Sequence, residues 1–576
     1  MADTLISPGV LALENDQSFI TQQPITVGAA IIGPTVKGPV EVPTIVTSYS
    51  DYQNKFGTTF LSASQVYTYF TSIAAFNYFN NGGESLLVAR VVSGTFTSAF
   101  TSGSGGRINN ADNNEALVLK TISQGKLMNS SCSLDASGSL IDSGSSDNIR
   151  WQIANRDTGS GTFSLLIRQG DDNAVNPVVL ETWTNLSMDP TAPNYVSRVI
   201  GNQAVAYNSV DNQVTTTGDY PNASKYVYVS SVLTPTPLYF DNTGIAKSQY
   251  TSSIPSNASG SFNGATGDLY GAGAKYYNNI VPGVTNIQGL LSSSYDNMIA
   301  LLSNQDDYRF NVLMTPGLFA SAAPLGSSQV TSIINNTQNR GDSIFISDLV
   351  PFSSSITEIV TQANAKNTSY AAAYWPWVQT IDPDSAQLVW VPASTMIGGV
   401  YAYNDSVSEP WFAPAGINRG GLSTVVKAEK KLTQANRDTL YTNKINPIST
   451  FPGTGVVVYG QKTLQTKASA LDRVNVRRLL ISLKSYISQV ANNLVFEQNT
   501  IATRTSFLNQ VNPYLESVQQ RQGLYAFRVI MDDSNNTPDV IDRNQLVGQI
   551  YIQPTKTAEF IYLNFNILPT GATFPA

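Results

Sequence analysis

The C-terminal residues 546–576 carry the clearest hydrophobic pattern in the chain. Two strand-like runs flank a Pro-Thr-Lys-Thr turn, and the second run alternates between two sets of side chains. One set is Ile561, Leu563, Phe565 and Ile567, and the other is Phe560, Tyr562, Asn564 and Asn566. This period of two predicts a strand over residues 558–567 with one strongly apolar face. Such a strand must be paired and covered, or it recruits another chain.

Further upstream, strand and helix patterns alternate along the chain. Apolar runs typical of buried strands lie at 25–33, 85–92, 308–317, 342–351 and 369–379. Helical patterns lie at 64–83, 298–304, 329–341 and 356–367. This alternation predicts an α/β layer with a largely parallel sheet.

Residues 97–285 differ in character, because they are rich in Gly, Ser, Asn, Thr and Asp and contain short alternating strands, such as a predicted hairpin at 151–170. The strand at 85–92 belongs with the later ones, so this β-rich stretch splits one domain. The expected fold class is therefore a multidomain α+β and α/β protein with extended N- and C-terminal arms. The expected parts are an N-terminal arm (1–22), a first core part (23–96), an insertion of one or two subdomains (97–285), a second core part (286–545) and C-terminal strands with an arm (546–576).

A long amphipathic helix is predicted over residues 473–496. Its apolar positions recur at spacings of three and four, while Arg473, Arg477 and Arg478 lie in its first turns and Lys484 follows. Positive charge at a helix N-terminus opposes the macrodipole by about 0.3–1 kcal/mol. Two interpretations stay open. Either the basic face is solvated, or capped and neutralised by Asp472, or it is a docking surface for an acidic partner. A second helix follows, and Pro513 is expected to bend or restart it.

The amino-acid composition argues against several classes of function. Charged residues make up 13% of the chain and the net charge is −7, which argues against nucleic-acid binding. No apolar run approaches the ~18 residues of a membrane span, so no membrane insertion is expected. The N-terminus lacks the features of a signal peptide and Cys132 is the single cysteine, as expected for a protein made in a reducing cytoplasm.

The chain contains no histidine, which excludes Ser-His-Asp and Cys-His nucleophile systems and histidine zinc sites. Three acidic pairs, at 171–172, 382/384 and 532–533, lie among turn-forming residues, where capping explains them. Gly103-Ser104-Gly105 superficially resembles a nucleophile elbow, but no strand–helix pattern flanks it. No phosphate-binding loop is present. We therefore expect no enzymatic activity, no cofactor and no metal.

Several motifs, taken in order, resemble those of the tail sheath proteins of contractile-tailed, T4-like bacteriophages. They cover residues 5–92 and about 350–570. The motifs are Ser7-Pro8-Gly9-Val10, Gly33-Pro34 with Lys37-Gly38-Pro39, Tyr374-Trp375-Pro376-Trp377, the stretch VPASTMIGGVYAYNDSVSEPWFAPAGINRGGL, Phe451-Pro452-Gly453, Tyr459-Gly460 with Lys462-Thr463, and the ending DRNQLVGQIYIQPTKTAEFIYLNF. The insertion matches no motif of this family.

The resemblance implies an α/β core near a tail axis with insertion domains facing outward. It implies hexameric rings stacked helically around a tail tube protein, with baseplate and tail terminator proteins as further partners. The chain would belong to the virion tail, with assembly in the host cytoplasm. Contraction would exchange one set of subunit interfaces for a better one, without a nucleotide, and would drive the tube through the host envelope.

The resemblance also implies that the arms add strands to a sheet in neighbouring subunits. We expect the N-terminal arm to use Ser7, Pro8, Gly9, Val10, Leu11 and Leu13. We expect the C-terminal arm to use Phe560, Ile561, Leu563, Phe565 and Ile567. The basic helix is the candidate for tube contact, through Arg473, Arg477, Arg478 and Lys484.

Two alternatives differ in kind. The sheath of a tailocin or another contractile injection system would have the same fold and mechanism, and genome neighbours would distinguish it. A secreted β-rich adhesin or carbohydrate-binding protein is suggested by the Asn/Ser/Thr-rich insertion, but the α/β core and the missing export signal count against it.

Overall fold

The computed structural model describes residues 25–62, 65–102, 106–129, 146–172, 175, 177–269, 273–321 and 326–561. Its largest element is an eight-stranded sheet with the order β2-β5-β1-β16-β17-β18-β22-β23. The six inner strands are parallel, and β2 and β23 pair antiparallel at the two edges. In this order the strands are Thr44–Val46, Leu86–Arg90, Ile25–Gly33, Tyr308–Phe319, Ile344–Asp348, Ala371–Trp375, Ile445–Phe451 and Gly455–Val458. The predicted parallel sheet, including the strand at 85–92, is confirmed.

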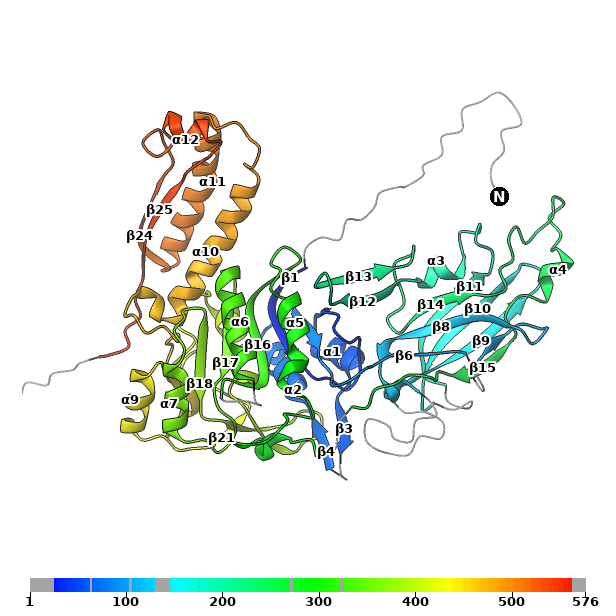
Figure 1. Ribbon diagram of the computed structural model, residues 1–576, viewed down its shortest axis with the longest axis horizontal. Coiled ribbons are helices and arrows are strands. Elements are labelled where there is room, and N and C mark those ends of the chain that lie inside the picture. Colours follow the sequence, from blue (N-terminus) through cyan, green and yellow to red (C-terminus); the bar gives the residue numbers. More distant parts are fainter. Residues whose placement is uncertain are drawn as a thin grey trace, which may run out of the picture.

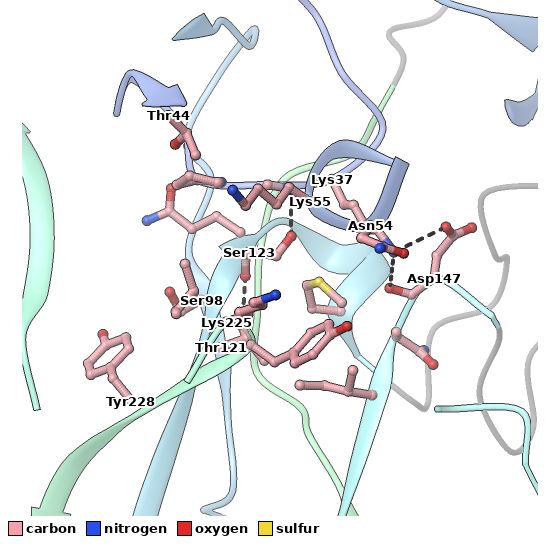
Figure 2. Close-up of a pocket in the computed structure, with 18 of the residues that line it drawn as sticks. Lys37, Thr44, Asn54, Lys55, Ser98, Thr121, Ser123, Asp147, Lys225 and Tyr228 are labelled. Carbon is pink, nitrogen blue, oxygen red and sulfur yellow. Dashed lines mark hydrogen bonds and ion pairs between the residues drawn. The ribbon is translucent and has the colours of Figure 1, made fainter. Parts of the chain in front are cut away.

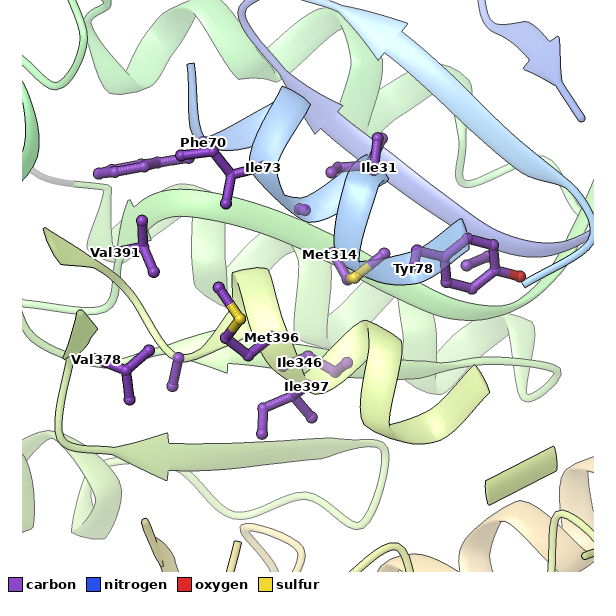
Figure 3. Close-up of a cluster of buried hydrophobic side chains, with 14 of the residues drawn as sticks. Ile31, Phe70, Ile73, Tyr78, Met314, Ile346, Val378, Val391, Met396 and Ile397 are labelled. Carbon is purple, nitrogen blue, oxygen red and sulfur yellow. The ribbon is translucent and has the colours of Figure 1, made fainter. Parts of the chain in front are cut away.

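Alternate residues of each strand contribute to two separate hydrophobic clusters, one on each face of the sheet. In β1, Ala29 and Ile31 belong to one cluster, while Ala30 and Ile32 belong to the other. Helices α2 (Phe70–Asn80) and α8 (Ser394–Val407) cover the first face, and Figure 3 shows side chains of both, such as Ile73 and Met396, in the same cluster as Ile31. The second cluster includes residues of four other helices: α5 (Asp296–Leu301), α6 (Ser327–Arg340), α7 (Ile356–Asn364) and α9 (Gln434–Thr442).

Two glycines of α8 allow close packing, Gly399 against α2 and Gly398 against β16. A Cβ at Gly399 would lie 2.6 Å from the carbonyl oxygen of Asn77 in α2. A Cβ at Gly398 would lie 2.2 Å from the sulfur of Met314 in β16. The Gly398-Gly399 pair in the quoted family stretch is thus explained by packing of α8 onto the sheet and onto α2.

Two sequence predictions in this region are wrong. The predicted helix at 64–83 begins with a strand instead: β3 (Thr59–Ser62) and β4 (Gln65–Thr68) form a hairpin, and α2 starts only at Phe70. β-branched and aromatic residues at Val66, Tyr67 and Thr68 favour this extended conformation. The predicted strand at 369–379 divides at Pro376, which has no N–H to continue the ladder. Its second half, β19 (Val378–Ile381), pairs instead with β20 (Leu388–Val391) and β21 (Val425–Ala428).

The strands between β5 and β16 form sheets of their own, away from the eight-stranded sheet (Figure 1). One sheet has the order β11-β10-β9-β15, a second has the order β14-β8-β6 with β7 beside β8, and β12 pairs with β13. Their bounds are β6 (Ser98–Phe100), β7 (Ile108–Asn109), β8 (Glu115–Gln124), β9 (Ile149–Asp157), β10 (Thr162–Gln169), β11 (Val179–Ser187), β12 (Ala204–Asn208), β13 (Gln213–Thr217), β14 (Val227–Val232) and β15 (Ala258–Ser261). The predicted hairpin at 151–170 is confirmed as β9–β10.

These inserted sheets enclose a hydrophobic cluster of their own, which includes the buried side chains of Trp151, Phe163 and Leu165. The core resumes earlier than the predicted boundary at 286, since Tyr277 and Ile280 already pack in the cluster around α2. The insertion is joined to the core at Arg90, the last residue of β5. Its buried guanidinium donates hydrogen bonds to the carbonyl oxygens of Gly38 and Gln124, one on each side of the junction.

Candidate inter-subunit interface

The C-terminal part of the chain forms a small unit beside the core (Figure 1, upper left). It comprises α10 (Val474–Asn492), α11 (Ile501–Gln520), β24 (Leu524–Ile530), α12 (Pro538–Asp542) and β25 (Gln549–Pro554). The two long helices and the strands share one hydrophobic cluster, whose buried members are Trp411, Leu479, Leu483, Val490, Phe507, Val511, Leu515, Val518, Leu524 and Met531. α11 is one continuous helix that contains Pro513, so the helix does not restart there.

β24 and β25 form a two-stranded antiparallel sheet. Phe527, Val529, Ile550 and Ile552 turn one face of this sheet toward the helices. The outer edge of each strand is open, because no other described strand pairs with either of them. A row of unpaired N–H and C=O groups is a template for strand addition by another segment. Of the two predicted C-terminal runs, the first is thus confirmed as a strand.

The predicted arm residues lie largely outside the described part of the chain. This applies to Ser7, Pro8, Gly9, Val10, Leu11 and Leu13, and to Leu563, Phe565 and Ile567. Phe560 and Ile561 are described, and they are 69% and 76% exposed. Neither lies in a strand, so the prediction of a strand beginning at 558 is wrong for residues 558–561 of this single chain. An extended segment forms a ladder only when a neighbouring strand supplies hydrogen-bond partners.

Glu559 fastens the segment that follows β25 to the body of the protein. Its carboxylate accepts hydrogen bonds from Nε (2.7 Å) and Nη2 (2.9 Å) of Arg473, a bidentate arrangement. The hydroxyl of Tyr441 donates to the same carboxylate at 2.8 Å. The amide of Gln461 donates to Glu559 at 3.0 Å and to the hydroxyl of Thr557 at 2.6 Å. Sequence reasoning missed this cluster, because its residues are distant along the chain.

The charges in this cluster are mutually compensated. Burial alone would raise the pKa of the Glu559 carboxyl, but hydrogen bonds from Arg473, Tyr441 and Gln461 outweigh it and hold that pKa below its ordinary value. Asp472 also pairs with Arg473, at 3.0 Å. Arg473 precedes the first turn of α10, where a positive charge is unfavourable, and the two carboxylates offset it. The sequence interpretation that Asp472 neutralises this charge is therefore confirmed in part, with Glu559 as the second partner.

The prediction of an exposed basic face on α10 is wrong for two of its four residues. Arg477 and Arg478 are only 4% and 3% exposed. Arg477 donates to the Ser369 hydroxyl and lies 4.0 Å from the ring centroid of Tyr370. Arg478 pairs with Asp405, and its guanidinium lies 4.7 Å from the ring centroid of Tyr401, both residues of α8.

Lys484 is exposed, and its ammonium lies 3.3 Å from the hydroxyl of Tyr370. Arg473 is partly exposed but committed to Glu559 and Asp472. The prediction failed because helical periodicity only places Arg477 and Arg478 on one face of the helix. It does not reveal that aromatic rings and an aspartate of the core cover that face.

The acidic pairs have structural roles. Asp172 pairs with Arg168 at 2.6 Å, and Asp384 accepts hydrogen bonds from Tyr49 (2.6 Å) and Gln53 (2.9 Å). Asp532 accepts a hydrogen bond from the backbone of Ser534 within a turn. Among the described residues, no group of three or more His, Cys, Asp or Glu side chains is arranged to hold a metal ion. None of the described helices has the length and apolar character needed to cross a membrane.

A cavity of about 330 Å³ lies where the inserted sheets meet the core (Figure 2). Lys37 and Lys55 come from the core side and Lys225 from the insertion. Lys37 pairs with Asp147 at 3.5 Å and Lys55 pairs with Asp51 at 2.9 Å. Because aspartates compensate two of these three lysines, the cavity does not concentrate positive charge, and we regard it as part of the joint between core and insertion.

Comparison with known proteins shows which proteins parts of this chain resemble. Residues 293–464 match the central domain of phage tail sheath proteins, and residues 466–568 match the C-terminal domain of the same proteins. The tail sheath protein of Vibrio phage KVP40 is 44% identical over 208 residues, which are 36% of this chain and 31% of that protein. The tail sheath protein of Enterobacteria phage T4 is 44% identical over 185 residues, 32% of this chain and 28% of that protein.

These alignments therefore span less than a third of either phage protein. Among solved structures, the sheath tail protein of Listeria innocua is similar with a TM-score of 0.52 and 10% identity, covering 92% of this chain and 95% of that one. This likeness extends the shared fold across almost the whole chain.

Proposed function

We propose that this chain, which carries the central and C-terminal domains of the phage tail sheath family, is the structural subunit of a contractile tail sheath. In this proposal the subunits form stacked hexameric rings around a tail tube and connect to baseplate and terminator proteins at the ends. The observation that carries the proposal is the open-edged β24–β25 sheet, located in the part of the chain that matches the family.

The proposed connection between subunits is strand addition to the two open edges. One edge would receive residues of an N-terminal arm, around Ser7–Leu13, and the other would receive C-terminal residues after Ile561. Main-chain hydrogen bonds make such a junction directional and tolerant of side-chain identity. The arms would preserve the junction while the subunit bodies rotate and slide during contraction.

The energy for contraction would come from the interfaces themselves. The extended sheath would be a metastable assembly, and contraction would replace its contacts with a better set. Summed over a polymer, a few kcal/mol per subunit performs large mechanical work. The sequence, which lacks a phosphate-binding loop, is consistent with this nucleotide-free mechanism.

Truncation tests the proposal directly. A chain lacking residues 562–576, and a second lacking residues 1–22, are compared with the full chain by negative-stain electron microscopy and sedimentation. We expect both to stay folded, since neither deletion removes a described residue of the core, and to fail to form tubes. Sheath-like tubes of normal length from either truncated chain would refute strand addition by that arm.

A matched control separates arm loss from general damage. Tyr551 lies on the outer face of β25 with its side chain 55% exposed. The substitution Tyr551→Thr keeps a β-compatible residue and leaves the backbone edge intact, so tubes should still form. Loss of tubes in this variant would indicate that side chains, and not the backbone edge, make the junction.

A further inference from the structure

The segment between β25 and the last described residue is attached to the body at one side only. In residues 555–561 the side chains of Thr557 and Glu559 are hydrogen-bonded to the body. Lys556, Ala558 and Phe560 are exposed between and beyond them. Side-chain hydrogen bonds to the protein thus occur at Thr555, Thr557 and Glu559, which is every second position, as in an extended chain.

The attachment at Glu559 differs from an ordinary surface ion pair. Exposed pairs are weak because both side chains lose rotamer freedom and water screens the charges. Here the Glu559 side chain is only 18% exposed, against 69% for Phe560 next to it. Its carboxylate is held by groups from α9 (Tyr441), from the stretch after β23 (Gln461) and from the start of α10 (Arg473).

The rigid parts that hold Glu559 belong to both the core and the C-terminal unit. Tyr441 lies on α9, whose residue Leu440 is fully buried against the core sheet. Arg473 precedes α10, whose residues Leu479 and Leu483 pack beneath the β24–β25 sheet. Glu559 is therefore fixed where these two bodies join, whereas Phe560 and Ile561 extend from that point into solvent.

We propose that Glu559 is the fixed root of the C-terminal arm: it holds the chain to its own subunit, and the portion that crosses to a neighbour begins after it. This inference rests on the proposed strand addition. Fixing the root shortens the tether between the body and the docking edge, which raises the effective concentration of the arm at that edge. It also places the pulling force of a moving neighbour on a partly buried, bidentate ion pair instead of on the end of β25.

The first measurement needs no polymer. Hydrogen exchange is followed on the full-length, unassembled chain and on the variants Glu559→Gln and Lys556→Gln. Glu559→Gln keeps the size of the side chain but removes its charge, so exchange should rise several-fold at the amide of Thr555, which donates to the carbonyl oxygen of Gly523 at the base of this segment. Lys556→Gln, in the same segment with an exposed side chain, should leave exchange unchanged. Equal exchange in Glu559→Gln and in the unsubstituted chain would overturn the proposal.

The second measurement tests the consequence for assembly. The concentration at which tubes form is determined by sedimentation for the same three proteins. We expect this concentration to rise several-fold for Glu559→Gln and to stay unchanged for Lys556→Gln. If exchange rises but the assembly concentration does not, Glu559 fastens the segment without acting as the root of an arm, and the proposal is overturned.

The truncated chain lacking 562–576 distinguishes the two levels of inference. If it fails to form tubes while Glu559→Gln assembles normally, strand addition survives and the fixed root is refuted. If it forms normal tubes, strand addition by this arm is refuted, and so is the proposal that Glu559 is the root of the arm. The hydrogen-exchange result for Glu559 would still describe how the segment is fastened within the fold.

Discussion

The edges of the eight-stranded core sheet are short or covered, whereas the edges of the two-stranded β24–β25 sheet are open. One edge of the core sheet is β2, only three residues long, and the Lys55 ammonium donates to the carbonyl oxygen of Ile45 there. The other edge is β23, where backbone groups of Gly416, Gly420 and Leu422 bond to Val456 and Val458. In contrast, β24 and β25 have seven and six residues, and no described backbone segment pairs along the outside of either.

Short edge strands, lysines and covering loops are ways in which proteins prevent edge-to-edge association. These features are present at the edges of the eight-stranded sheet and are missing, among the described residues, from the edges of the β24–β25 sheet. The comparison supports the small sheet as the surface meant for other chains, and it predicts that the two regions can be damaged separately.

The largest effect is expected at the connection between the two regions. Arg478 of α10 pairs with Asp405 of α8, so this pair joins the C-terminal unit to the core. Arg478→Ala should lower the free energy of unfolding by about 3 kcal/mol, because it leaves Asp405 without its partner and removes a buried side chain. Thermal unfolding checks this, with Arg528→Ala on exposed β24 as the control. A change below that of the control would mean that the two regions are joined by other contacts.

The next effect should be confined to the C-terminal unit. Leu515 of α11 is fully buried beneath β24 and β25. Leu515→Ala should destabilise this unit by about 2–3 kcal/mol through lost burial and the cavity left behind. Hydrogen exchange should accelerate in β24 and β25 and remain slow in β16, while the neighbouring exposed Glu516→Ala changes neither. Faster exchange throughout the molecule would show that the two sheets unfold as one unit.

A third effect contrasts two carboxylates, one in each region. Burial raises the pKa of Asp348, at the end of β17, to about 6 despite hydrogen bonds from Ser394 and Gly317. A raised carboxyl pKa makes the folded state bind protons more tightly, so stability falls as pH rises from about 4 to above 6. Glu559 has a lowered pKa, so its contribution is complete above about 4.5 and is lost only in more acidic solution.

Acidification from pH 7 to pH 5 should therefore strengthen the core while Glu559 remains attached. The upper bound on the Asp348 contribution is about 3 kcal/mol, from a shift of roughly two pKa units. Asp348→Asn should flatten the dependence of the unfolding temperature on pH in this range, and Glu559→Gln should leave it unchanged. If Asp348→Asn keeps the original pH dependence of the unfolding temperature, other titratable groups are responsible for that dependence.

The contrast between the regions also explains what could be predicted from sequence. Periodicity located the buried strands of the core, since Ala29–Ile32 must alternate between two helical layers whatever the neighbours are. It failed at Val66–Thr68, where local β-preference prevailed, and at Pro376, where one apolar run serves two sheets. In the C-terminal unit it identified both long helices and β25.

What periodicity could not supply was the set of partners of each charged side chain. Arg477 and Arg478 occupy helix positions that would suit a solvated face, and only tertiary contacts with Tyr370 and Tyr401 bury them. Glu559 lies 86 residues from Arg473 along the chain, a separation at which no spacing rule operates. Ion pairs between distant elements depend on the assembled fold, and a pattern along the chain does not contain them.

The smallest effect concerns the remaining candidate for contact with a tube. Of the four basic residues at the start of and along α10, Lys484 is the exposed one, with its ammonium beside the Tyr370 hydroxyl. Arg477 and Arg478 are buried, and Arg473 is engaged by two carboxylates. Lys484→Glu should change the free energy of unfolding by no more than about 0.5 kcal/mol. If an acidic tube surface contacts α10, the same variant should weaken tube-templated assembly, most strongly at low salt. Since Glu559 and the open edges are untouched by this change, tube-free assembly should proceed as before; unaltered templated assembly would remove α10 from the proposed tube contact.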